Sequence, residues 1–261
     1  MRPSISGDEL LARRLTAHGG LERWRQVEAM RVNVVTGGLA LASHGQREFR
    51  TEAVVSAWEP RVVLFPFRRW PRGIFERDRV RLEDEHGRVV AERTDARRLM
   101  ARGRRELWWG ALDTLYFVGY ALSNYLRAPF LFAQEGFRLE SAGAVACGTQ
   151  IWQRLRVTFP PDEPTHCPTQ VYYFDAGGLI RRIDYLAEPI GRWARAAHFC
   201  EDYREFSGLR LPTRRWVLPR GPNDAVWPWP RLMKIAIEPL ELLSGRPPSI
   251  VIGDRRRLGC Y

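Results

Sequence analysis

A line of polar side chains runs through the most apolar stretch of the sequence, from Leu107 to Phe132. Its members are three or four residues apart, the spacing that places side chains on one face of a helix. They are Asp113, Tyr116, Tyr120, Asn124 and Arg127. Such groups amid apolar surface could line a cavity and orient the polar end of a ligand. The alternative interpretation is that the charges mark the helix ends and the tyrosines pack in the core.

A histidine on a predicted strand offers a second kind of chemistry. Alternation places Ala194, Ala196, His198 and Cys200 on one face of their strand, and the small alanines leave room beside the imidazole. A lone strand histidine is also typical of a hydrogen-bonded structural residue. His166 lies in a predicted loop with ordinary solvation, where a function is allowed without being implied.

Proton transfer is the reaction that these residue types could support together. Asp113, Tyr120 and His198 supply a carboxylate, a phenol and an imidazole that titrates near neutral pH. The sequence alone does not bring the three within bonding distance. No serine or cysteine is visibly tied to His198, so a catalytic triad is not indicated.

Motifs of the common cofactor enzymes are missing from the sequence. There is no G-x-G-x-x-G after a predicted strand, no Walker-type lysine loop, no H-E-x-x-H and no G-x-S-x-G. The four cysteines stand far apart without a C-x-x-C pair, so neither a zinc site nor a disulfide framework is indicated. We therefore expect reduced thiols, no cofactor and no metal.

Composition narrows the class of partner. The 261 residues are 45% hydrophobic, which predicts a substantial core, and the length suits one large domain or two small ones. About a dozen expected strands interrupted by one long helix favour a single domain over residues 1–261. The net charge is +11, with Lys234 the single lysine among many arginines. Tryptophans stand beside arginines at 67–72 and 227–231, but acidic residues alternate with the arginines between 76 and 88. We expect no nucleic acid, and the Trp-Pro-Trp-Pro run at 227–230 could instead seal a pocket mouth or make a transient membrane contact.

The sequence also predicts a location. The first twenty residues carry charges throughout and hold no apolar run of the kind found in signal peptides. The longest uncharged apolar run, from Thr114 to Leu126, falls short of the roughly 20 residues that a membrane-spanning helix needs. We expect a cytoplasmic protein.

Hydrophobic periodicity predicts the elements that position these residues. Ser6, followed by Asp8 and Glu9, predicts a helix over 6–18 that stops at Gly19-Gly20. A long central helix is expected over 104–127. Strands are expected at 29–37, 46–57, 61–66, 74–83, 87–93, 136–141, 151–159, 168–175, 178–187, 192–203, 209–218 and 232–238.

The short spacing of these strands favours antiparallel meanders over βαβ units. The clearest hairpin lies near 170–186, where Gly177 and Gly178 can take the positive φ of a tight turn. The predicted fold is α+β and mainly antiparallel β: a strongly curved sheet or open β-barrel with the 104–127 helix as a lid over its concave face. Residues 239–261 are expected to form an irregular C-terminal tail.

Several segments resemble the LolA/LolB-like lipoprotein carriers, and more closely a group of bacterial proteins with that layout. The resemblance covers about residues 8 to 238, and its residues are Ala17 to Trp24, Tyr116 to Ala121, Asn124 to Leu126, Pro129-Phe130, Tyr173 to Asp175 and Leu211 to Arg215. It implies an unclosed antiparallel barrel with helices over its hollow, which holds an acyl chain or another apolar molecule.

These observations predict a binding protein for an apolar or amphipathic small molecule, lipid-like or polyketide- or terpenoid-like, held between the curved sheet and the long helix. The predicted ligand-binding residues are Trp108, Tyr116, Phe117, Tyr120, Asn124, Arg127, Tyr173 and Trp193. The alternative is a cofactor-independent enzyme, such as a cyclase, isomerase or dehydratase, that uses the same cavity. Its predicted catalytic residues are Asp113, Tyr120 and His198.

Overall fold

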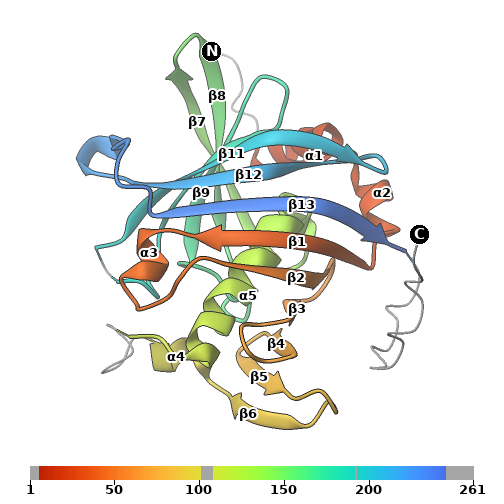
Figure 1. The fold of residues 1–261 in the computed structure, drawn as a ribbon. Coiled ribbons are helices and arrows are strands. Elements are labelled where there is room, and N and C mark those ends of the chain that lie inside the picture. Colours follow the sequence, from red (N-terminus) through yellow and green to blue (C-terminus); the bar gives the residue numbers. More distant parts are fainter. Residues whose placement is uncertain (1–5, 101–107, 192, 245–261) are drawn as a thin grey trace, which may run out of the picture.

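A computed structural model describes residues 6–100, 108–191 and 193–244 and arranges them around one antiparallel sheet (Figure 1). Within these residues the sheet has thirteen strands in the order β6-β5-β4-β3-β2-β1-β13-β12-β11-β10-β9-β8-β7. The strands are β1 (Ala29–Gly37), β2 (Phe49–Ser56), β3 (Arg61–Phe65), β4 (Arg72–Glu76), β5 (Arg79–Glu83), β6 (Val89–Arg93), β7 (Arg138–Cys147), β8 (Gln150–Thr158), β9 (Thr169–Phe174), β10 (Ile180–Leu186), β11 (Arg195–Phe206), β12 (Leu209–Pro219) and β13 (Met233–Leu243).

Strand β1 joins two meanders, one from β1 to β6 and one from β7 to β13. Thr36 of β1 lies opposite Phe49 in β2 on one side and opposite Ile235 in β13 on the other. The edge strands β6 and β7 do not pair with each other, so the sheet curves but stays open over the described residues (Figure 1). The predicted fold class, an open and mainly antiparallel barrel with a helical lid, is confirmed.

Short helices stand around the sheet. They are α1 (Gly7–Ala17), α2 (Leu21–Arg25), α3 (Leu39–Ala42), α4 (Ala96–Met100) and the 3-10 turns η2 (Phe130–Ala133) and η3 (Pro222–Asp224). Helix α1 begins as the sequence predicts, because the Ser6 hydroxyl accepts a hydrogen bond from the Glu9 amide at 3.1 Å. No helix of the described residues is long and apolar enough to cross a membrane.

The central helix α5 (Ala111–Arg127) begins later than the expected residue 104. Residues 104–107 lie outside the described residues, and residues 108–110 are not helical. The helix begins after Gly110 because the Asp113 carboxylate accepts a hydrogen bond from the Gly110 amide at 2.9 Å and so caps the first turn. It ends at Arg127, just before Ala128 and Pro129, as expected.

Helix α5 lies on the concave side of the sheet, and its residues from Asp113 to Arg127 are all buried. Gly119 brings the helix close to β4, because a Cβ at this position would lie 2.5 Å from the Cβ of Phe75. The helix therefore packs directly against the part of the sheet from β2 to β6.

Two local expectations are wrong, and a third is right for one of its two residues. Residues 74–83 form two strands, β4 and β5, because Arg77 takes a φ of 55° and turns the chain. Strand β13 runs through Pro239 to Leu243, since the proline sits at a bulge in the pairing with β1, where no ladder hydrogen bond is lost. In the hairpin between β9 and β10, Gly178 and not Gly177 has a positive φ, of 87°. Residues 245–261 of the expected tail lie outside the described residues.

Candidate ligand-binding cavity

A cavity of about 460 Å³ lies between α5 and the strands β1 and β10 to β13. Its wall is mainly apolar. Helix α5 contributes Phe117, Val118, Ala121, Leu122 and Tyr125, and the sheet contributes Tyr185, Ala196, Val217, Met233 and Ile235. The volume lies within the range of roughly 300–1,000 Å³ in which proteins bind one small molecule.

One end of the cavity carries exposed apolar side chains, which we call the cavity mouth: Leu39, Trp193 and Trp227. Their exposed fractions are 48%, 71% and 52%. Trp229 follows within the same Trp-Pro-Trp-Pro run and is 79% exposed. Large apolar side chains rarely remain this exposed together unless they meet a ligand, a partner or a membrane.

A buried part of the cavity wall, here called the cavity floor, is formed by Tyr125, His166 and Tyr185. The three are buried, and each lines the cavity. The His166 Nε2 atom lies 2.7 Å from the Tyr125 hydroxyl, and this hydroxyl lies 3.3 Å from that of Tyr185. The His166 Nδ1 atom lies 2.9 Å from the Tyr120 hydroxyl on the side away from the cavity. The floor thus places hydrogen-bonding groups in the wall of an apolar cavity.

The floor is uncharged at neutral pH. Burial lowers the pKa of His166 to about 3, with a smaller contribution from the positive charge of Arg97. Burial also raises the pKa of Tyr125 and Tyr185 well above the usual value for a phenol. A ligand that reaches the floor therefore meets a neutral imidazole and neutral phenols.

His198 lies behind this floor on β11 and is completely buried. Its Nδ1 atom is 3.4 Å from the Tyr185 hydroxyl, and its Nε2 atom is 3.4 Å from a guanidinium nitrogen of Arg215 on β12. Burial first, and then the charge of Arg215, lowers the pKa of His198 well below 6.5. His198 therefore belongs to the hydrogen-bonded network of the floor but does not itself line the cavity.

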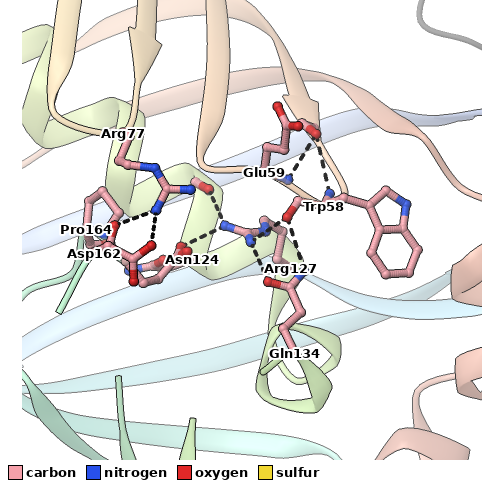
Figure 2. Close-up of polar contacts among 11 residues, drawn as sticks. Trp58, Glu59, Arg77, Asn124, Arg127, Gln134, Asp162 and Pro164 are labelled. Atoms are coloured by element: carbon pink, nitrogen blue, oxygen red, sulfur yellow. Dashed lines mark hydrogen bonds and ion pairs between the residues drawn. The ribbon is translucent and has the colours of Figure 1, made fainter. Parts of the chain in front are cut away.

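Asn124 and Arg127 of the predicted polar face of α5 do not line the cavity and bind other segments of the chain (Figure 2). Asn124 donates to the Pro164 carbonyl at 3.0 Å, and the Arg127 guanidinium donates to the Trp58 carbonyl at 3.1 Å. Arg127 also pairs with Glu163 at 2.7 Å. These polar groups are buried and need partners, and the 160–168 segment provides Pro164 and Glu163 among them.

The other predicted ligand-binding residues are spread over the molecule. Phe117 and Trp193 line the cavity. Tyr116 lines a separate pocket of about 500 Å³ under the 160–168 segment, and Tyr120 contacts His166 from that side. The Tyr173 hydroxyl donates to Asp184 at 2.8 Å, and Trp108 is 60% exposed with its ring beside Gly45.

The three predicted catalytic residues are only partly brought together. Tyr120 and His198 are linked through His166, Tyr125 and Tyr185. Asp113 stands seven residues before Tyr120 on α5, about 10 Å along the helix axis. It caps the helix and forms an ion pair with Arg93. No group of three or more metal-ligating side chains occurs in the part of the chain that the structure describes.

His166 is the residue that sequence reasoning placed wrongly. The expectation of ordinary loop solvation is wrong, because the side chain is 2% exposed and its ring stacks on Tyr185. The segment around it contains Pro160, Pro161, Pro164 and Pro168, and prolines lack the amide donor that makes a buried loop costly. This abundance of proline is the signal that could have indicated a packed segment.

Comparisons with known proteins identify the fold. No protein-family model and no curated protein matches the sequence. Among solved structures, a LolA superfamily protein from Nitrosomonas europaea matches with a TM-score of 0.54 at 11% identity, over 93% of this chain and 96% of that chain. A DUF1329 family protein from Desulfovibrio piger matches with a TM-score of 0.47 at 10% identity, over 92% of this chain and 94% of that chain. A putative outer membrane lipoprotein-sorting protein domain from Vibrio parahaemolyticus matches with a TM-score of 0.45 at 10% identity, over 92% of this chain and 93% of that chain. The chain has a LolA-like fold, as the resemblance implied.

Proposed function

We propose that the protein binds one apolar or amphipathic small molecule in the cavity beside α5. The observation that carries this proposal is the combination of an apolar wall, an exposed apolar mouth and a neutral polar floor in one cavity of about 460 Å³. Burial of apolar ligand surface against this wall would supply the binding energy, and the floor would orient the polar end.

The mouth supports a carrier role for this protein. Trp193 and Trp227 are amphipathic side chains of the type enriched where proteins meet the membrane interface. A ligand of low solubility leaves or enters a membrane more readily when the mouth touches the bilayer surface. We therefore propose a transient membrane contact through the mouth. The location in the cell stays a prediction that fractionation would test.

The enzyme alternative receives less support. Asp113 is occupied by Arg93 and the start of α5, and His198 lies outside the cavity wall. The predicted acid–base set therefore does not converge on one point of the cavity. We do not propose a reaction, and turnover of a bound ligand remains a separate measurement.

A cavity-filling substitution tests the proposal. Ala121 lines the cavity from α5, so Ala121→Phe should fill part of the space and weaken uptake of a fluorescent fatty-acid analogue by about tenfold or more. Ala12→Phe is the matched control, because Ala12 is an exposed alanine on α1. Equal uptake by both variants, with native thermal unfolding, would contradict the cavity as the binding site.

A further inference from the structure

Arg215 is a buried cation without a carboxylate partner among the described residues. It is 3% exposed, and its guanidinium donates to the Tyr125 carbonyl at 2.6 Å and to the Cys200 sulfur at 3.0 Å. Its Nε atom has no hydrogen-bond partner within residues 6–100, 108–191 and 193–244. Arg127, which is equally buried, pairs with Glu163. A buried charge is costly unless it is paired, so the contrast indicates that the counter-ion of Arg215 comes from outside the described residues.

The cavity is where such a counter-ion could lie. The Arg215 guanidinium sits over the ring of Tyr125, 5.1 Å from its centroid, and Tyr125 lines the cavity floor. The cavity wall includes no aspartate or glutamate among the residues that the structure describes, and its charged members are Arg195 and Arg220. Both arginines form ion pairs with Asp224, at 3.6 and 2.6 Å. An anion in the cavity would therefore meet no carboxylate among the described residues of the wall.

Arg215 also fixes the direction of the hydrogen bonds that lead to the floor. A guanidinium can only donate, so the Nε2 atom of neutral His198 accepts from Arg215 and its proton must sit on Nδ1. Nδ1–H then donates to the Tyr185 hydroxyl oxygen. The hydroxyl proton of Tyr185 is left to donate toward Tyr125 or toward the cavity.

The bond from Tyr185 to Tyr125 is long. Its 3.3 Å separation exceeds the common O–H···O distance of about 2.7 Å, whereas the Tyr125 hydroxyl lies only 2.7 Å from the His166 Nε2 atom. A negatively charged oxygen in the cavity would be a stronger acceptor for the Tyr185 proton than the Tyr125 hydroxyl is. Both phenols can thus remain hydrogen-bonded when a carboxylate reaches the floor.

We propose that the ligand is a single-chain amphiphile that ends in a carboxylate, such as a long-chain fatty acid, bound with its carboxylate at the floor. Tyr185 donates a hydrogen bond to the carboxylate. The Arg215 guanidinium, which lies over the Tyr125 ring and donates to His198, balances the charge of the carboxylate. The hydrocarbon chain runs along the apolar wall to the mouth. This inference rests on the proposed function, and it adds the head group and the orientation of the ligand.

A pair of ligands of equal chain length tests the inference: palmitic acid and hexadecanol, measured by displacement of a neutral fluorescent probe at pH 7.5. The acid should bind about ten- to a hundredfold more tightly, since hydrogen bonds to charged groups are the stronger ones. Arg215→Met and Tyr185→Phe should each reduce affinity for the acid and leave that for the alcohol within about twofold. Arg215→Lys, which keeps the charge, should retain part of the preference.

Tyr203→Phe is the control, because the Tyr203 hydroxyl donates to the Ile180 carbonyl at 2.7 Å and does not line the cavity. If Arg215→Met does not fold, Tyr185→Phe alone decides, since it removes one oxygen and keeps the ring. Equal affinity of acid and alcohol for the wild-type protein would overturn the inference and leave the proposed function intact. Failure of both ligands and the probe to bind folded protein would overturn the proposed function itself.

Discussion

His166 stacks on Tyr185 with ring centroids 4.2 Å apart and an angle of 6° between the ring planes. This contact joins the 160–168 segment to β10 at the floor of the cavity. It places a loop residue, a strand residue and, through the Tyr125 hydroxyl, a helix residue in one hydrogen-bonded group. The cavity floor therefore depends on three parts of the chain that are distant in sequence.

Buried histidines should make the protein unstable in mild acid. The folded-state pKa values of His166 and His18 are lowered to about 3 and about 4, both by burial, from 6.5. Below pH 6.5 the unfolded chain binds protons that the folded chain does not. The free energy of unfolding should thus fall as pH drops from 6.5 toward 4, by up to about 1.4 kcal/mol per pH unit for each histidine.

Urea unfolding between pH 7.5 and 4.5 measures this dependence. In His166→Gln the free energy of unfolding should depend less steeply on pH. One fewer histidine then takes up a proton in the unfolded chain but not in the folded chain. His86→Gln is the control, since His86 is exposed and should leave the slope unchanged. A stability that does not change between pH 6.5 and 5 would contradict the neutral, buried histidines.

The ion pair between Arg127 and Glu163 should matter far more than a surface pair. Glu163→Ala leaves the fully buried Arg127 guanidinium without its carboxylate and should lower the free energy of unfolding by about 3–5 kcal/mol. Glu9→Ala removes the exposed pair with Arg13 and should cost less than about 1 kcal/mol. Chemical denaturation of both variants gives the comparison, and similar losses would speak against a buried Arg127 pair.

Gly119 should be essential for the position of α5. A Cβ added there would lie 2.5 Å from Phe75, so Gly119→Ala should push the helix away from β4 and lower the free energy of unfolding by about 1–3 kcal/mol. Phe75→Leu should relieve part of this clash. A double-mutant cycle measures the coupling, and strictly additive losses would show that the two residues do not touch.

The exposed tryptophans of the mouth should control ligand exchange with membranes. Replacing Trp193 and Trp227 by alanine should slow transfer of a fluorescent fatty-acid analogue to anionic vesicles several-fold. Ile151→Ala is the control, because Ile151 is 64% exposed but does not line the cavity. An unchanged transfer rate in the double variant would contradict membrane contact through the mouth.

Local sequence signals predicted the fold better than the site. Strand β1 has the predicted bounds of 29–37, because alternation and the flanking glycines act within a few residues. The sequence shows the polar spacing on α5 but not what these side chains bind. Asn124 and Arg127 bind the protein's own 160–168 segment. Periodicity reveals which residues share a face and does not reveal what that face meets.

The floor could not have been derived from local patterns at all. Tyr125, His166 and Tyr185 belong to a helix, a loop and a strand, and they meet because the sheet curves around α5. Arg215 reaches His198 because β11 and β12 pair with Arg215 opposite Cys200, two residues from His198 on the same face of β11. These are consequences of tertiary packing over long separations.

The central claim is that one amphipathic molecule occupies the cavity beside α5, and native mass spectrometry tests it most directly. Purified protein incubated with a total lipid extract should carry a single adduct per chain, and denaturing extraction should release it. Ala121→Phe should lose this adduct while Ala12→Phe keeps it. A folded wild-type protein that takes up no molecule from the extract, or an adduct that Ala121→Phe retains in full, would contradict the claim.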